Sequence, residues 1–330
     1  MQFEPLSAIF APAIGAIITF ILIAATLKFD RLRFAIDQPN ERSLHNRPVP
    51  RTGGAAIMLG IVAAFLWLGW APGMLALALA LAVVSLVDDR RGLPIGVRLA
   101  AHVLAAAVFG VIWLGDTWPA VFCLLSIVAV IWITNLYNFM DGADGLAGGM
   151  AVFGFGAYAI ALFAAGQAGA AAATLSIALA AGSFLLFNFH PARVFMGDAG
   201  SIPLGFLAAT IGLLGVRDGV WPIGFPLLVF SPFIIDATLT IVRRALRGER
   251  FWQAHRTHYY QRLVQLGWGH RRTALAEYAL MSACACIALW TRTESIVIQI
   301  AALTAVGIGY VLVAVAVDRT WAQVRPDSPA

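Results

Sequence analysis

Residues 135–149 read NLYNFMDGADGLAGG and place amides and carboxylates at the end of a long apolar run. Asn135 and Asn138 precede Asp141 and Asp144, and a glycine follows each aspartate. Carboxylate and amide oxygens are the ligands that Mg²⁺ and Mn²⁺ prefer, and glycine lets a metal or a phosphate approach the backbone closely. Polar side chains are energetically costly at membrane depth, so this segment is a candidate functional site.

The elements that must position this segment are apolar. The chain of 330 residues is 61% hydrophobic and only 12% charged, and its mean hydropathy is +0.84, far from the values of soluble domains. Apolar runs long enough to cross a bilayer recur along nearly the whole chain. They predict an all-α integral membrane protein, a polytopic bundle of 10–11 helices in one domain over residues 1–330. The predicted helices span 8–27, 54–70, 73–88, 97–114, 119–137, 146–165, 168–187, 201–216, 221–242, 273–291 and 294–317.

Within this set, 201–216 has the weakest signal, and the count falls to ten if one run is re-entrant. Lysine and arginine predict the orientation of the helices. With the N-terminus outside, only Arg217 and Arg292 of the 22 basic residues lie on the outer side, as the positive-inside rule requires. The net charge of +5 is therefore explained by topology and does not indicate nucleic-acid binding. The first apolar run precedes its positive charges, which favours an N-out anchor over a cleaved signal peptide.

The inner connections carry almost all the chemically capable side chains, including five of the six histidines. The first reads DQPNERSLHNRPVPRTGG over residues 37–54. Juxtamembrane basic loops commonly hold lipid headgroups, which is one interpretation. The other is a rigid phosphate-facing loop in which the prolines place His45 and Arg51.

Three further inner connections add acids and cations. Asp88 and Asp89 are adjacent, with Arg98 in the next predicted helix; like charges repel, so one of the two acids is expected to be protonated or to share a cation. Asp198 lies between glycines in FMGDAGS. The fifth connection contains AHRTHYYQRL, where arginines around the histidines favour a phosphate site over a metal site.

One face of the membrane thus gathers aspartates, amides, histidines and arginines beside a hydrocarbon surface. This set suits phosphoryl transfer, in which a divalent ion neutralises a diphosphate, arginines hold its oxygens, and a carboxylate positions or deprotonates the attacking oxygen. We infer an enzyme that joins a cytosolic phosphorylated donor to a membrane lipid.

These motifs resemble a known family, the polyprenyl-phosphate N-acetylhexosamine-1-phosphate transferases of glycosyltransferase family 4. It includes the undecaprenyl-phosphate GlcNAc-1-phosphate transferase and the phospho-MurNAc-pentapeptide transferase. The resemblance covers residues 37–262 in the right order. Its elements are DxPxxRxxHxxxxPRxGG, the DD pair, NxxNxxDGxDGLAGG, FMGDxGS and the histidine-containing arm at His255–His258.

The resemblance implies that undecaprenyl phosphate attacks the β-phosphorus of a UDP-sugar in the bacterial inner membrane, which releases UMP and leaves a lipid diphosphate sugar. It implies Asp144 and Asp198 as ligands of Mg²⁺, with Mn²⁺ as an alternative. It implies that Asp88 and Asp89 activate or orient the lipid phosphate. It implies catalytic roles for His255 and His258, in the arm that grips the diphosphate and the sugar together with Arg256. Asn138 and Asp141 would line the nucleotide and metal pocket. The remaining implied substrate contacts come from Asn135, Arg98, Arg51 and His45.

Two positions depart from the family pattern. Arg98 replaces the usual lysine, which keeps the charge but changes its geometry. The arm lacks the dense histidine run of the pentapeptide transferase and the His-x-His-His of GlcNAc-type enzymes. It looks closer to the branch that starts O-antigen or capsule repeats with 6-deoxy-N-acetylhexosamines, and the donor sugar stays open. The resemblance is compatible with a homodimer, on which the sequence itself is silent.

Two other functions use similar residues. An intramembrane Mg²⁺-dependent prenyltransferase also has acids at helix ends, but its motifs place further acids three or four residues on, whereas Arg90, Arg91 and Gly92 follow the DD pair here. An ion-coupled secondary transporter would place its acids near the bilayer midplane in an internal repeat, and no repeat is visible.

Overall fold

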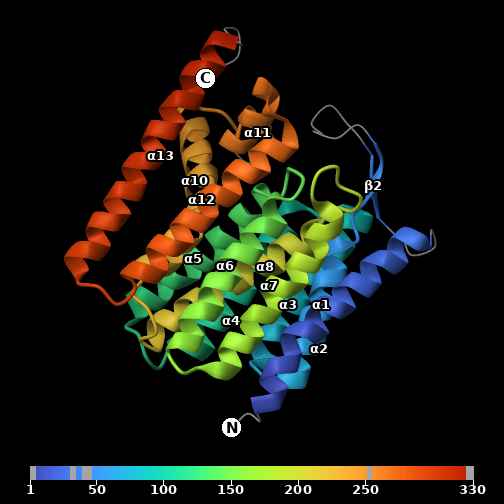
Figure 1. Ribbon diagram of the computed structural model, residues 1–330, viewed down its shortest axis with the longest axis vertical. Coiled ribbons are helices and arrows are strands. Elements are labelled where there is room, and N and C mark those ends of the chain that lie inside the picture. The colour runs from blue at the N-terminus through green and yellow to red at the C-terminus, as the bar shows by residue number, and fades with distance from the viewer. Residues whose placement is uncertain (1–4, 30–34, 39–46, 251–254, 325–330) are drawn as a thin grey trace.

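The computed structural model describes residues 5–29, 35–38, 47–250 and 255–324, which form a bundle of helices with one small hairpin (Figure 1). The hairpin pairs β1 (Ile36–Asp37) antiparallel with β2 (Val49–Pro50). The α-helices are α1 (Pro5–Lys28), α2 (Gly53–Leu68), α3 (Pro72–Arg91), α4 (Ile95–Phe109), α5 (Ala120–Phe139), α6 (Leu146–Ala164), α7 (Ala168–Asn188), α8 (Asp198–Arg217), α9 (Gly224–Val229), α10 (Ser231–Leu246), α11 (Tyr259–Leu263), α12 (Gly269–Thr291) and α13 (Ile296–Val324). Two π-helical turns, η2 (Gly110–Leu114) and η3 (Val264–Trp268), continue α4 and α11.

The prediction of an all-α, polytopic membrane protein is confirmed. Nine helices of the described residues are long and apolar enough to cross a membrane, and α2 is a shorter apolar helix of 16 residues. The single helix predicted over 221–242 is wrong, because α9 ends before Phe230 and α10 begins after it. Pro232 lies in the first turn of α10, where its missing N–H is tolerated; inside a continuous helix it would remove a hydrogen bond.

The helix with the weakest sequence signal lies at the centre of the bundle. The apolar window of α8 is 83% buried, more than that of any other spanning helix of the described residues. Small residues allow this close packing. A Cβ on Gly205, for example, would come within 2.8 Å of Cβ of Tyr137 in α5. The hydropathy of α8 equals that of α6, so its burial, and not a low hydropathy, distinguishes it among the described spanning helices.

Chemically capable segments gather at one end of the bundle. The two chain termini lie at opposite ends, and β2 and α11 lie at the end nearer the C-terminus (Figure 1). The basic last turns of α3 and α10 also belong to the predicted inner side.

Candidate active site

Four aspartates come together around the first turn of α8: Asp88, Asp89, Asp141 and Asp198, which we call the acid centre. Asp198 interacts electrostatically with Asp88 and shares a side-chain hydrogen bond with Asn138. Asp89 and Asp141 both lie in the field of Asp198, and the Asp141 carboxylate accepts the N–H of Gly197. The acids come from the end of α3, from the turn after α5 and from the start of α8.

A backbone contact between distant segments brings Arg51 to this centre. The N–H groups of Gly53 and Gly54 donate to the carbonyls of Phe195 and Met196, at 3.0 Å and 2.9 Å. Gly54 is so close to Gly200 that a Cβ on it would lie 2.3 Å from the Gly200 nitrogen. Only glycine therefore fits there, and the end of the first inner loop is fixed against the start of α8.

The charges of the acid centre do not balance. Arg98 Nη1 lies 2.8 Å from Asp88 Oδ2 and 3.9 Å from Asp198 Oδ2, and Arg51 Nη1 lies 3.8 Å from Asp89 Oδ1. These two guanidiniums face four carboxylates. The surplus of negative charge, in a partly buried site, favours a divalent cation.

The two members of the DD pair have different surroundings. Asp88 is fully engaged, because its Oδ1 accepts the N–H of Leu93 at 2.6 Å and its Oδ2 accepts Arg98 at 2.8 Å. The Oδ2 of Asp89 is buried and has no hydrogen-bond partner among the described residues. Since an unpartnered buried carboxylate oxygen is unfavourable, this atom is open to a ligand.

Asp141 lies in the turn between α5 and α6, beside Asp198. Burial, and then the charge of Asp198, raise the pKa of Asp141 well above its usual range, and Arg51 acts in the opposite direction. A cation bound between the two carboxylates would favour the ionised form of both.

Asp144, three residues further on, belongs to a different cluster. Its Oδ2 lies 2.6 Å from His190 Nδ1 and accepts the N–H of Ala192 at 3.1 Å. Its own N–H donates to His270 Nδ1 at 3.2 Å, and the rings of His190 and His270 stack at 5.4 Å. One ligand atom from Asp144, His190 and His270 each lies within 4.8 Å of the others, so this group could itself hold a metal ion.

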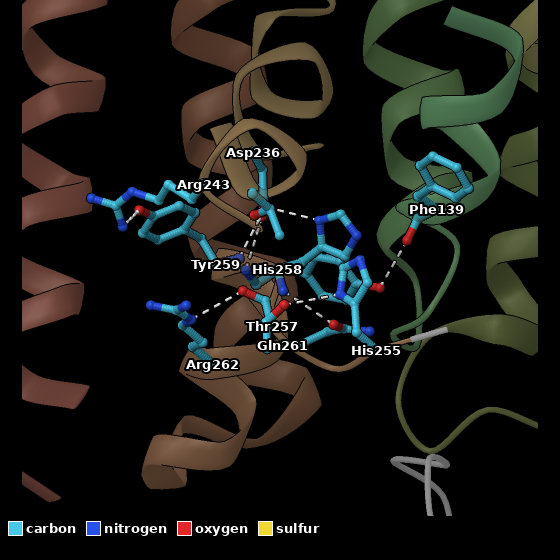
Figure 2. A network of polar contacts seen from close by, with 11 residues as sticks. Phe139, Asp236, Arg243, His255, Thr257, His258, Tyr259, Gln261 and Arg262 are labelled. Atoms are coloured by element: carbon cyan, nitrogen blue, oxygen red, sulfur yellow. Dashed lines mark hydrogen bonds and ion pairs between the residues drawn. The ribbon is translucent and has the colours of Figure 1, made fainter. Parts of the chain in front are cut away.

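The histidine-containing arm is fixed to α10 by one carboxylate, Asp236 (Figure 2). Its Oδ1 accepts the N–H of Tyr259 at 2.9 Å and its Oδ2 accepts that of Tyr260 at 3.0 Å. The Oδ1 also lies 3.2 Å from His258 Nδ1 and accepts the Thr240 hydroxyl at 3.2 Å.

A tyrosine joins this arm to the turn that carries Asp141. The Tyr260 hydroxyl donates to the carbonyl of Phe139 at 3.2 Å and accepts the N–H of Gly142. Burial, and then the nearby charges of His258 and Arg244, lower the pKa of His255 to about 3, so His255 is neutral at neutral pH. The arm therefore presents an uncharged imidazole.

Comparisons with known proteins agree with this arrangement. The model of the family described as Glycosyl transferase family 4 matches residues 71–216, which contain all four acids of the centre. The chain is 31% identical to the decaprenyl-phosphate N-acetylglucosaminephosphotransferase of Mycobacterium tuberculosis, over 80% of this chain and 77% of the relative. It is 30% identical to the probable undecaprenyl-phosphate N-acetylglucosaminyl 1-phosphate transferase of Bacillus subtilis, over 81% and 80%. The chain belongs to glycosyltransferase family 4.

A third relative acts on a different substrate, by its name. The phospho-N-acetylmuramoyl-pentapeptide-transferase of Moorella thermoacetica is 32% identical, over 81% of this chain and 93% of the relative. Relatives with different donors thus have almost the same identity to this family 4 chain. Overall similarity therefore establishes a multi-pass membrane transferase but does not identify the sugar donor.

The structure brings most of the predicted site residues of this family 4 member together. Asp88, Asp89, Asn138, Asp141, Asp198, Arg51 and Arg98 lie in or against the acid centre. Asn135 faces away, since it donates to Ile131 O at 2.7 Å and bonds His102. His258 is 3% exposed and held by Asp236, while the side chain of Arg256 is exposed. His45 lies outside the described residues.

The predicted pairing of Asp144 with Asp198 has no support in the contacts. No hydrogen bond or ion pair of Asp144 within the described part of the chain reaches the acid centre, and Asp141 is the acid of that turn that lies beside Asp198. Sequence reasoning also missed His190, His270 and Asp236. The two histidines had a usable signal, because both lie in predicted inner connections. Asp236 had only its position in the inner half of the helix predicted over 221–242.

Proposed function

We propose that this family 4 transferase moves a sugar 1-phosphate from a UDP-sugar to undecaprenyl phosphate at the cytoplasmic face of a bacterial inner membrane. The donor is an N-acetylhexosamine or its 6-deoxy form, the products are UMP and a lipid diphosphate sugar, and the product starts an O-antigen or other envelope polysaccharide. The names of the relatives support the polyprenyl phosphate acceptor and the sugar phosphate group. They give no support to the alternatives of a prenyltransferase or a transporter.

The acid centre carries the proposal. Its excess of carboxylates over guanidiniums, at the border of a membrane bundle, suits a substrate that arrives as a diphosphate with a cation. The oxygens of Asp198 and Asp141 fit Mg²⁺ or Mn²⁺, since they are hard donors. A divalent cation bound there would neutralise the charge that builds up on the diphosphate during transfer. The buried Asp89 Oδ2, which has no hydrogen-bond partner among the described residues, is left for the attacking phosphate.

The residues of the chain supply the remaining steps. Arg51 and Arg98 hold phosphate oxygens by charge-assisted hydrogen bonds. An oxygen of the lipid phosphate attacks the β-phosphorus, the bond from that phosphorus to the bridging oxygen breaks, and the oxygen leaves with UMP. Asp89 orients the attacking phosphate or takes its proton, because Asp88 is already occupied by Arg98 and Leu93.

An apolar cavity is available for the hydrocarbon chain of the acceptor. It has a volume of about 170 Å³ and is lined from α5, α6, α8, α9 and α10, with Trp132, Tyr158 and Phe230 among its walls. The break between α9 and α10 lies at this cavity, because Phe230 is the residue between the two helices.

A donor panel tests the function. Membranes that contain the protein, undecaprenyl phosphate and Mg²⁺ are incubated with UDP-GlcNAc, UDP-GalNAc, UDP-QuiNAc or UDP-FucNAc, and UMP release is measured. We expect release with at least one donor, dependent on the lipid phosphate, and fastest with a 6-deoxy sugar. Absence of UMP with every donor, from protein shown to be folded, would contradict the proposal.

A further inference from the structure

A group of arginines lies behind the arm. Figure 2 shows Arg243 and Arg262 on the opposite side of His258 from Phe139, the residue that borders the Asp141 turn. Here a cavity of about 100 Å³ opens between α10 and the arm. Four arginines line it, and we call it the arginine cavity: Arg243, Arg244, Arg247 and Arg262, together with Thr257 and Tyr259.

The charges of this cavity are only partly neutralised by the protein. Asp318 accepts Arg243 at 2.6 Å and Arg262 at 2.8 Å, and Glu249 accepts Arg244 at 2.7 Å. Arg247 has no carboxylate partner among the described residues. Four guanidiniums against two carboxylates leave two positive charges, which is the charge that one phosphate group complements.

An unsatisfied donor lies in the wall of the same cavity. The Nε of Arg244 is buried and has no hydrogen-bond partner among the described residues. A buried donor without a partner is unfavourable, so an acceptor is expected beside it. Guanidinium groups bind phosphate oxygens through paired N–H donors, which gives the acceptor a chemical class.

We propose that the arginine cavity is a binding site for one phosphate group, separate from the acid centre and from the donor and acceptor of the transfer reaction. This phosphate group could belong to the headgroup of an anionic phospholipid or be a free phosphate ion. Beside the cavity, α10 presents Val242 and Leu246, which are 46% and 83% exposed. These two residues lie one helical turn apart on one face and give acyl chains an apolar surface next to the arginines.

The site has a direct connection to the arm. Arg262 donates from Nε to the carbonyl of Thr257 at 3.0 Å, and the Thr257 hydroxyl lies 2.9 Å from His255 Nδ1. A phosphate that bridges Arg247 and Arg262 would stiffen the segment that carries His255. Anionic lipids are concentrated in the cytoplasmic leaflet, where the basic ends of α3 and α10 are predicted to lie.

Native mass spectrometry of the full chain tests this site. Protein in a neutral detergent receives phosphatidylglycerol or phosphatidylcholine, and the fraction that retains lipid is measured with and without millimolar inorganic phosphate. The variants are Arg247→Gln and Arg244→Gln/Arg247→Gln. The matched control is Arg319→Gln, which removes the same charge from the exposed surface of α13 near the same end of the bundle.

We expect the wild type to retain phosphatidylglycerol over phosphatidylcholine and Arg247→Gln to weaken this retention about tenfold, the effect of one charge-assisted hydrogen bond. Arg319→Gln should match the wild type, and the melting temperatures of all proteins should agree. If inorganic phosphate instead raises the melting temperature of the wild type and not that of Arg247→Gln, with equal lipid retention in both, the proposal of a phosphate site stands, and free phosphate is the ligand. Equal behaviour of Arg247→Gln, the double variant and Arg319→Gln with every probe would overturn the proposal.

Discussion

Two carboxylate sites of this transferase differ in how completely their oxygens are used. Asp236 accepts two backbone N–H groups and a threonine hydroxyl and faces one histidine, with each contact between 2.9 and 3.2 Å. In the acid centre, four carboxylates share two guanidiniums, and one buried oxygen of Asp89 has no hydrogen-bond partner in the described part of the chain. A satisfied buried carboxylate organises the chain around it, whereas an unsatisfied one is prepared for a ligand.

The largest effect should come from Asp198, at the centre of the unsatisfied site. Asp198→Asn keeps the shape of the side chain and removes its charge, so we expect about a 10³-fold loss of UMP release that added Mg²⁺ does not restore. Membrane insertion and melting temperature should be unchanged. Asp218→Asn, which alters an exposed ion pair with Arg217 on the outer side, is the control. If the activity of Asp198→Asn stays within about tenfold of the wild type, the acid centre is not the reaction centre, and its contrast with the Asp236 site has no functional meaning.

The two members of the DD pair should separate in steady-state kinetics. Asp89→Asn removes the oxygen without a partner, and we expect kcat to fall about 10²-fold with KM nearly constant. Asp88→Asn releases Arg98 from its ion pair, so KM for the phosphorylated substrates should change more than kcat. Identical kinetic patterns in the two variants would show that their different surroundings have no functional meaning.

Substitution of Asp236, the carboxylate with all its contacts satisfied, should lower the stability of the protein more than its catalytic rate. Asp236→Asn leaves one of the two tyrosine N–H groups opposite an amide N–H₂, and a buried donor without an acceptor costs about 2 kcal/mol. We expect a lower melting temperature and a smaller loss of kcat than in Asp198→Asn. The reverse order, with full stability and abolished activity, would move Asp236 into the catalytic group.

The smallest effect should be a pH dependence that originates in the arm. The pKa of His255 is lowered to about 3, whereas an unfolded histidine titrates near 6.5. Between these values the unfolded chain binds a proton that the folded chain does not, so this group lowers stability as the pH falls from about 6.5 towards 3. The melting temperature of His255→Gln should therefore decrease less than that of the wild type between about pH 7 and pH 5. Parallel curves would contradict the burial of this imidazole.

The apolar runs predicted the bundle well because hydrophobic length is a local property of the chain. The break at Phe230 was less visible, since Pro232 is compatible with both a kink and a helix start. The motif DGADG does not indicate which aspartate faces Asp198, because side-chain directions in an irregular turn do not follow the regular repeat of a helix or a strand. Gly145 adopts φ of 79° at its end, and this left-handed step puts Asp144 against His190 and His270. Asp236 was missed because its donors come from the arm, more than twenty residues later.

The contact of Gly54 with Gly200 determines which parts of this enzyme can change during evolution. The positions of Arg51 and Asp198 depend on main-chain hydrogen bonds between the Gly53-Gly54 pair and residues 195 and 196, which no side-chain exchange nearby can adjust. Substitutions in the arm can therefore leave the spacing of Arg51 and Asp198 unchanged. A backbone contact of this kind makes the geometry of the acid centre insensitive to side-chain exchange elsewhere in the chain.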